Sequence, residues 1–224
     1  MDETKQITLP DVQADQEIRA YIDQADASLE AIGYTEHSFA HVTKCAHTAS
    51  TILLQLGYTP HEAELARIAG YMHDIGNVVN RNDHAETGAC IAFKLLDDKG
   101  MAPADTALVI TAIGHHDDPT AFPVNAIAAA LILADKTDVR RSRVRNQNTV
   151  NFDIHDRVNY AVTKSDLELD PEAKTITLHL TLDTDICPVM DYFEIFLERM
   201  ILCRRAAEFF SLAFRLEING QMLL

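Results

Sequence analysis

Histidine and aspartate residues recur in this sequence near the ends of predicted helices, and together they have the chemistry of a metal site. Imidazole nitrogens and carboxylate oxygens suit iron, manganese, zinc and related divalent ions, without selecting among them. A single inward-facing histidine is more typical of a satisfied core residue, so the interpretation depends on the whole set. The candidate ligands are His41, His73, Asp74, His84, His115, His116 and Asp135.

Asp135 gives the strongest physical reason to expect a metal ion. It directly follows residues 126–134, Ala-Ile-Ala-Ala-Ala-Leu-Ile-Leu-Ala, an unbroken apolar run that must be buried on nearly all sides. An unpaired carboxylate at the end of a buried helix costs free energy until a partner or a shifted pKa removes its charge. A bound cation is one such partner.

The elements that must position these residues are helices. Apolar residues recur at helical spacing in several segments, and Gly33, Gly57 and Gly100 follow three of them as stop signals. Residues 59–62, Thr-Pro-His-Glu, have the pattern of a capping box with proline in the first turn. The predicted helices cover about residues 18–32, 37–56, 60–73, 82–100, 103–116 and 126–134.

The composition changes after Asn146, which is the predicted boundary between two parts of the chain. Residues 1–146 are expected to form a helical metal-binding domain. Residues 147–224 are expected to form a C-terminal extension.

The extension has a mixed pattern. Residues 157–183 alternate in strand fashion, and residues 170–174, Asp-Pro-Glu-Ala-Lys, are typical of a hairpin turn. A long helix is predicted from about Pro188 to Leu216. Its apolar residues are too many for one core-facing stripe, so we expect a subunit interface here, most simply in a homodimer.

The order of the candidate ligands resembles the HD-domain superfamily of metal-dependent phosphohydrolases over roughly residues 36–145. Residues 41–57 look like the helix that bears the first ligand of that family. Residues 69–76, Ala-Gly-Tyr-Met-His-Asp-Ile-Gly, look like its defining His-Asp helix end. The resemblance implies a mainly α fold, a helical bundle followed here by a small β-hairpin and a long helix. It also implies a one-metal ligand set of His41, His73, Asp74 and Asp135.

Further histidines bear on the number of metal ions. His84 and the pair His115-His116 lie where two-metal members of the superfamily place ligands for a second ion. The resemblance thus implies one or two divalent ions, iron, manganese or zinc, with Asp74 as the bridge between two. The alternative is a single ion, with only a structural role for His84, His115 and His116.

Candidate substrate-binding residues come from two sources. One is a position that departs from the family pattern, and the other is a set of basic residues. Asn77 stands where many hydrolytic members have a lysine that contacts phosphate, and the paired histidines lack the Gly-Tyr-Pro of cyclic-dinucleotide phosphodiesterases. A basic run begins beyond Asp135 and is a candidate phosphate clamp or, equally, a solvated helix end. Lys44, one turn after His41, is a weaker candidate. The basic run comprises Lys136, Arg140, Arg141, Arg143 and Arg145.

The composition excludes some classes of partner. A formal net charge of −15 at pH 7 argues against broad binding to nucleic acid polymers or anionic membranes. The beginning of the sequence lacks the apolar run of a signal peptide, and the four cysteines are scattered without a Cys-x-x-Cys pair. We therefore expect a cytoplasmic protein. The resemblance to the HD-domain superfamily, together with the basic run, implies a small phosphorylated substrate.

The function that the resemblance implies is hydrolysis of a nucleotide or another small phosphate ester. In such an enzyme a metal-bound hydroxide attacks phosphorus, and His73 and Asp74 are the central catalytic residues. Two alternatives remain open. In the first alternative, the chain is an HD-type di-iron oxygenase. In the second, it is a nucleotide-sensing module in which the metal site stabilises the fold.

Overall fold

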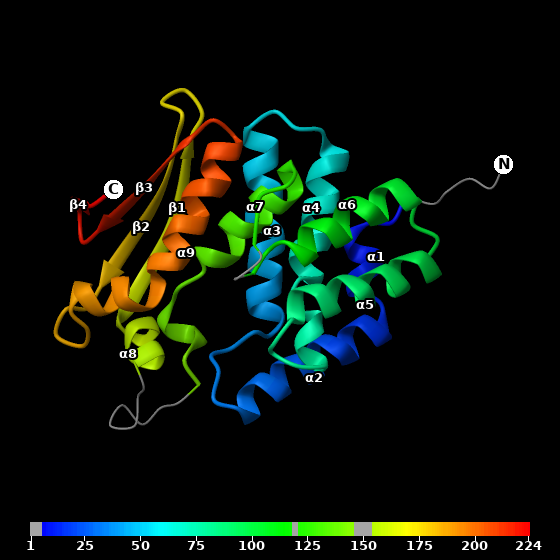
Figure 1. Cartoon of the computed structure of the whole chain (residues 1–224), viewed down its shortest axis with the longest axis horizontal. Helices are drawn as coiled ribbons and strands as arrows, with labels where there is room; N and C mark the ends of the chain where they lie inside the picture. The colour runs from blue at the N-terminus through cyan, green and yellow to red at the C-terminus, as the bar shows by residue number, and fades with distance from the viewer. Residues whose placement is uncertain (1–5, 118–120, 146–153) are drawn as a thin grey trace.

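The computed structural model describes residues 6–117, 121–145 and 154–224 (Figure 1). The fold is mainly helical, as predicted. The helical bundle consists of α1 (Leu9–Gln13), α2 (Gln16–Ala31), α3 (Phe39–Gln55), α4 (Pro60–Met72), the 3-10 turn η1 (Ile75–Val78), α5 (His84–Asp98), α6 (Pro103–Gly114) and α7 (Ala126–Lys136). The rest of the chain forms η2 (Arg141–Arg143), α8 (Ile154–Ala161), β1 (Val162–Asp170), β2 (Thr175–Leu182), α9 (Val189–Phe209), β3 (Ala213–Ile218) and β4 (Gln221–Met222).

Helices α2, α3, α4 and α7 begin after short polar side chains that accept hydrogen bonds from free backbone N–H groups. Asp15 accepts hydrogen bonds from the first turn of α2, and Asn125 accepts one from Ala128 at the start of α7. Thr59 and Glu62 form the predicted capping box of α4, with Pro60 as its first residue. The capping box predicted for α4 is therefore confirmed.

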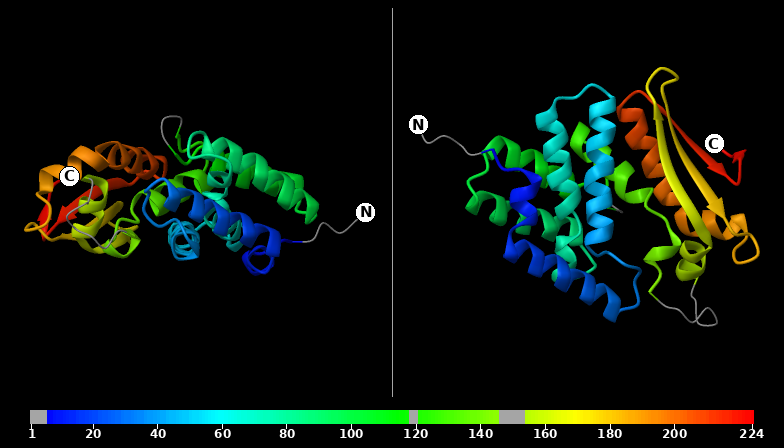
Figure 2. Two further views of the ribbon diagram at one scale, coloured as in Figure 1. Left: turned by 90° about the horizontal axis from the view of Figure 1, so that it is seen from below. Right: turned by 180° about the vertical axis from the view of Figure 1, so that it is seen from behind.

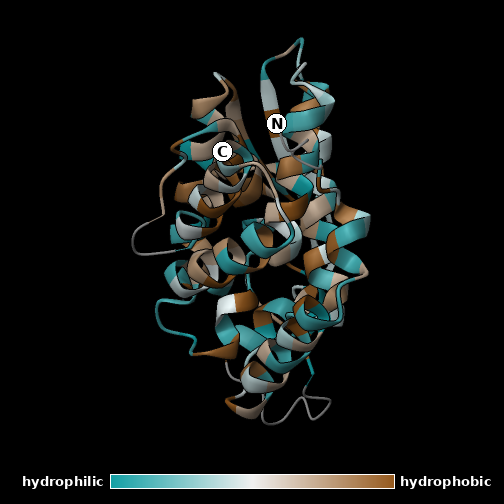
Figure 3. Ribbon diagram, turned by 90° about the vertical axis from the view of Figure 1, so that its right-hand side faces the viewer, coloured by the Kyte–Doolittle hydropathy of each residue, from teal (hydrophilic) through white to brown (hydrophobic). Residues whose placement is uncertain are grey.

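The core of the bundle lies around α3, α4 and α7. Every residue of α7 from Ile127 to Ala134 is buried, as its apolar run requires. Gly70 lets α4 approach α3 closely, because a Cβ at Gly70 would lie 2.7 Å from the Cα of Ala46. Figure 3 shows hydrophilic and hydrophobic residues alternating along most helices, which is typical of helices with one buried face. This close packing brings the ends of α3, α4 and α7 together.

The C-terminal part forms a small sheet in the strand order β1-β2-β3-β4, with α9 beside it (Figure 2). Strand β1 pairs with β2 antiparallel through the predicted turn at 170–174. Strand β2 pairs with β3 parallel, so α9 serves as the crossover between them. The predicted hairpin is thus present within a larger sheet.

Two predicted boundaries in this region are wrong. Residues 157–161 belong to helix α8, although strand β1 was expected to include them. Helix α9 ends at Phe209, short of the expected Leu216, and Ser211 has a φ of 59°. Residues 213–218 alternate between exposed and buried positions, so they fit the pleat of a strand better than a helix.

Helix α9 lies between α7 on one side and the sheet on the other. Tyr192, Phe196 and Met200 are among its buried residues. Burial on two sides absorbs much of the apolar excess that led to the prediction of a subunit interface. Among the described residues, no helix combines the length and the apolar character needed to cross a membrane.

Candidate metal centre

Histidine and aspartate side chains from α3, α4 and α7 converge at one buried point. The Nε2 atom of His41 lies 3.3 Å from Oδ1 of Asp135 and 3.5 Å from Oδ2 of Asp74. The Nε2 atom of His73 lies 3.2 Å from the same oxygen of Asp74 and 3.7 Å from Oδ1 of Asp135. Both histidines are completely buried. Potential ligand atoms of His41, Cys45, His73 and Asp135 all lie within 4.8 Å of one another, close enough to hold one metal ion.

A second group of potential ligands adjoins the first. Nε2 of His84 lies 3.5 Å from Oδ1 of Asp74, so the two oxygens of Asp74 face different histidines. The ring centroid of His116 lies 5.0 Å from that of His73 and 5.1 Å from that of His84. His73, Asp74 and His116 form a further set of mutually close ligand atoms. Asp74 therefore faces both groups of potential ligands.

Backbone carbonyls orient three of these rings. A carbonyl oxygen only accepts hydrogen bonds, so in each case Nδ1 carries a proton. Nε2 of His73 and His116 is then left for a metal ion, whereas Nε2 of His84 also lies 3.1 Å from Nη1 of Arg81. The Nδ1 atom of His73 lies 2.8 Å from the oxygen of Gly70, that of His84 3.1 Å from Arg81, and that of His116 2.6 Å from Ile113.

The fourth ring, that of His41, is oriented by a carboxylate. Its Nδ1 atom lies 2.8 Å from Oδ2 of Asp138, which is buried. Burial alone would raise the pKa of Asp138, but the hydrogen bond from His41, the charge of Arg143 and the hydrogen bond from Arg140 hold this pKa well below its usual range. Asp138 is thus ionised and fixes His41 with Nε2 toward Asp74 and Asp135.

Two buried polar atoms of the site lie 3.2 Å apart without forming a hydrogen bond. Nε2 of His73 and Oδ2 of Asp74 are buried and have no hydrogen-bond partner among the described residues. Burial disfavours the charged form of His73, but the charges of Asp74 and Asp135 outweigh it and raise the pKa of His73 to about 10. Without a metal ion, a protonated His73 balances these carboxylates. The donor set and its unsatisfied atoms fit a divalent cation.

Two glycines bring η1 against α5, and with it His84 into the site. A Cβ at Gly76 would overlap the carbonyl oxygen of His84 and lie 2.5 Å from the nitrogen of Gly88. A Cβ at Gly88 would lie 3.3 Å from the carbonyl oxygen of His73. The Gly76 of the His-Asp motif therefore has a steric role in the geometry of the site.

The centre opens into a cavity of about 390 Å³. Asp74, His84, His116 and Asp135 lie on its bundle side, with Asp117 beside them. Residues 32–35, between α2 and α3, line another part. The C-terminal extension supplies a further wall: His155, Asp156 and Asn159 from α8, and Phe196 and Arg199 from α9. The extension thus covers the candidate metal centre of its own chain.

The predicted phosphate clamp is largely engaged with protein groups. Lys136 is buried and its Nζ lies 2.9 Å from Oδ2 of Asp135, with a second contact to Asp117. Arg143 lines the cavity but donates hydrogen bonds to the carbonyl oxygens of Glu36 and Asp138, both at 2.9 Å. Lys136 and Arg143 therefore act first as counter-charges and braces.

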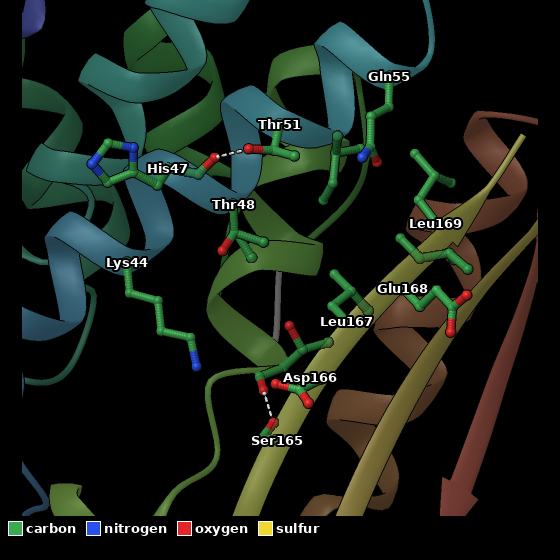
Figure 4. A pocket seen from close by; sticks show the side chains of 14 residues that line it. Lys44, His47, Thr48, Thr51, Gln55, Ser165, Asp166, Leu167, Glu168 and Leu169 are labelled. Carbon is green, nitrogen blue, oxygen red and sulfur yellow. Dashed lines mark hydrogen bonds between the residues drawn. The ribbon is translucent and has the colours of Figure 1, made fainter.

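The other basic candidates turn toward Asp138. Arg140 donates from Nε to Oδ1 of Asp138 at 2.9 Å, and Lys44 Nζ lies 2.7 Å from the same oxygen. Lys44 faces a separate pocket of about 440 Å³ between α3 and β1, where Figure 4 shows it across from Ser165 and Leu167. The structure does not bring Lys44 or Arg140 to the lining of the metal-site cavity.

Three further residues lie at different distances from the centre. Asn77 is buried and donates from Nδ2 to Oδ1 of Asp74 at 3.0 Å, so it holds a ligand in place. His37 lines the cavity and contacts the ring of His41, with centroids 5.5 Å apart. His115 lies outside both ligand groups and outside the cavity lining that the described residues form. It precedes His116 just beyond α6, and adjacent side chains there diverge.

Sequence reasoning missed four residues of this region. Asp138 is three residues after Asp135, a spacing that places two side chains on one side at a helix end. Asp117 directly follows His116, and its Oδ2 lies 3.6 Å from Nε2 of His84. Arg81 donates to Asp117 at 3.2 Å and lies over the ring of Tyr34. Arg199 gave no local signal, because α9 reaches the cavity only through the tertiary fold.

Comparison with known proteins agrees with this geometry. The family model described as HD domain matches residues 38–140. The Ribonuclease Y of Deinococcus radiodurans is 32% identical over 120 residues, and that of Thermus thermophilus is 33% identical over 115 residues. These matches cover 50% and 48% of this chain but 19% and 18% of the relatives. The chain therefore spans about a fifth of the length of the curated relatives that it matches.

Proposed function

Because residues 38–140 form an HD domain, we propose that this chain is a metal-dependent phosphohydrolase whose substrate is a small phosphate ester. The observation that carries the proposal is the convergence of buried, unpartnered ligand atoms, His73 Nε2 and Asp74 Oδ2 above all, beside a cavity. Buried polar atoms without partners are rare in proteins unless a ligand or function uses them.

The cavity favours a small substrate over a polymer. Its volume of about 390 Å³ lies near the lower end of the range for small-molecule sites, which is roughly 300–1,000 Å³. The net charge of −15 also disfavours a long polyanion. The relatives are named as ribonucleases, yet the match covers about a fifth of their length, so RNA is an outcome for the test below.

The residues fall into distinct proposed roles. His41, His73 and Asp135 would hold one divalent ion, and His84 and His116 would hold a second, with Asp74 shared. Bound ions would supply Lewis-acid activation of water and of the phosphoryl oxygens. Asp138 orients His41, Asn77 orients Asp74, and Lys136 balances the charge of Asp135 and Asp117.

The test is release of phosphate by purified protein loaded with manganese or iron, across nucleotides, other phosphomonoesters, phosphodiesters and short RNA. We expect hydrolysis of at least one small ester, its loss in Asp74→Asn and His73→Ala, and no change in Asp98→Asn, an exposed site on α5. No hydrolysis of any compound by metal-loaded protein would contradict the proposal. Oxygen uptake by the iron-loaded form would instead favour the oxygenase alternative.

Binding of nucleotides without turnover would favour the sensing module.

The homodimer and the cytoplasmic location expected from the sequence remain predictions. Size-exclusion chromatography with light scattering tests the first, and fractionation of the producing cells tests the second.

A further inference from the structure

Helix α9 carries two residues into the metal-site cavity from the C-terminal extension. Phe196 and Arg199 both line it, one helical turn apart. The Cζ atom of Arg199 lies 4.8 Å from the centre of the Phe196 ring, and Phe196 itself is buried. The ring therefore supports the guanidinium group against a rigid, buried part of the helix.

Arg199 differs from the other cations of the cavity in its partners. Arg81 is paired with Asp117, Lys136 with Asp117 and Asp135, and Arg143 with backbone carbonyls. Within the described ranges, Arg199 forms no hydrogen bond or ion pair with a protein group. It nevertheless lies near enough to Asp135 and Asp117 to feel their charges. A guanidinium group that lines a cavity with all its donors free is a site for an anion.

We propose that Arg199 binds the phosphoryl group of the substrate from the side opposite the metal centre, so that the C-terminal extension completes the active site. The inference rests on the proposed phosphohydrolase function and specifies its substrate class. A phosphomonoester has three non-bridging oxygens on phosphorus and can meet metal ions on one side and a guanidinium on the other. A phosphodiester has only two such oxygens. The arrangement therefore favours a phosphomonoester.

The first measurement is calorimetric binding of inorganic phosphate to manganese-loaded protein. Arg199→Gln should weaken binding about tenfold or more, and Arg199→Lys should retain most of it by keeping the charge. Arg204→Gln is the matched control, because Arg204 lies on the same helix with its side chain 59% exposed and paired with Glu208. Metal content and thermal unfolding of each variant show whether the fold and the centre are intact.

The second measurement compares para-nitrophenyl phosphate with bis-para-nitrophenyl phosphate as substrates. Arg199→Gln should lower kcat/KM for the monoester about tenfold or more and change that for the diester less than threefold. A merely structural role of Arg199 would lower both equally. Equal phosphate affinity in the wild type and Arg199→Gln, with hydrolysis intact, would overturn this inference alone. A metal-loaded wild type that neither binds phosphate nor hydrolyses either ester would overturn the proposed function as well.

Discussion

The Nδ1 atom of His41 lies 2.8 Å from Oδ2 of Asp138, and both residues are buried. This contact joins the beginning of α3 to the turn after α7. Asp138 also receives Lys44 and Arg140, so one carboxylate gathers cations that the sequence indicated for phosphate binding. The same contact sets the tautomer of His41 and directs its Nε2 atom toward Asp74 and Asp135.

Replacing Asp138 with asparagine should weaken metal binding. The amide loses the charge that holds Nδ1–H of His41, and removal of such an outer partner typically costs 10–100-fold in metal affinity. We therefore expect a loss of about that size in a chelator competition. Asp98→Asn, on the exposed face of α5, is the control. Unchanged affinity in Asp138→Asn would show that His41 does not depend on this contact.

Substitutions at the adjacent residues His115 and His116 should differ sharply in their effect on metal content. His116→Ala removes a ligand atom next to His73 and Asp74, so the metal content per chain should fall by about one ion. His115→Ala should leave the metal content unchanged, because that side chain lies outside the ligand groups of the described residues. Elemental analysis of protein purified without chelator measures both. A loss in His115→Ala with none in His116→Ala would contradict the proposed second site.

Metal affinity should rise with pH. The pKa of His73 is about 10 in the metal-free protein, because Asp74 and Asp135 outweigh its burial. A metal ion needs the deprotonated Nε2, so binding releases this proton at any pH below about 10. Burial lowers the pKa of His116 to about 3, so His116 is already neutral and releases none.

The apparent affinity should therefore increase about tenfold per pH unit between pH 7 and 9, as expected for one released proton. Calorimetry in buffers of different ionisation enthalpy counts the protons directly. A count near zero at pH 7.5 would mean that His73 is already neutral before the metal binds.

Substituting alanine for Gly76 should disrupt the second site. The new Cβ would overlap the carbonyl of His84 and cannot be accommodated by side-chain rotation. We expect a loss of about 1–3 kcal/mol in the free energy of unfolding, measured in urea, together with lower metal content. Gly114→Ala is the matched control, since its Cβ would make an ordinary 3.6 Å contact with Ala89. Equal stability of the two variants would contradict the steric role of Gly76.

The bundle and most of the ligand positions could be predicted because their signals are local. A capping box, a buried apolar run and a His-Asp pair each occupy a short stretch, and the fold uses them where they stand. The fold of the C-terminal extension was harder to predict from the sequence. Residues 213–218 follow an apolar helix without a proline or glycine, and only pairing with β2 decides that they form a strand.

The partners of charged groups could not be predicted for a related reason. Nothing near Arg140 or Lys44 in the sequence shows that both meet Asp138, because Lys44 lies on a different helix. Arg199 lies far along the chain from the ligands, and its place in the cavity depends on how α9 packs against α7. Sequence pattern indicates which residues are charged, whereas the tertiary fold decides which charges remain free for a substrate.

The wall formed by α8 and α9 also has a consequence for the order of biosynthesis. All proposed ligands and Asp138 precede residue 139, whereas Phe196 and Arg199 leave the ribosome later. Their helix is held by a sheet that needs β3, the parallel partner of β2. The residues proposed as metal ligands are thus synthesised before the residues of α8 and α9 that line the cavity. Truncation before α9 would leave a chain with every proposed ligand but without the groups that we assign to the phosphate.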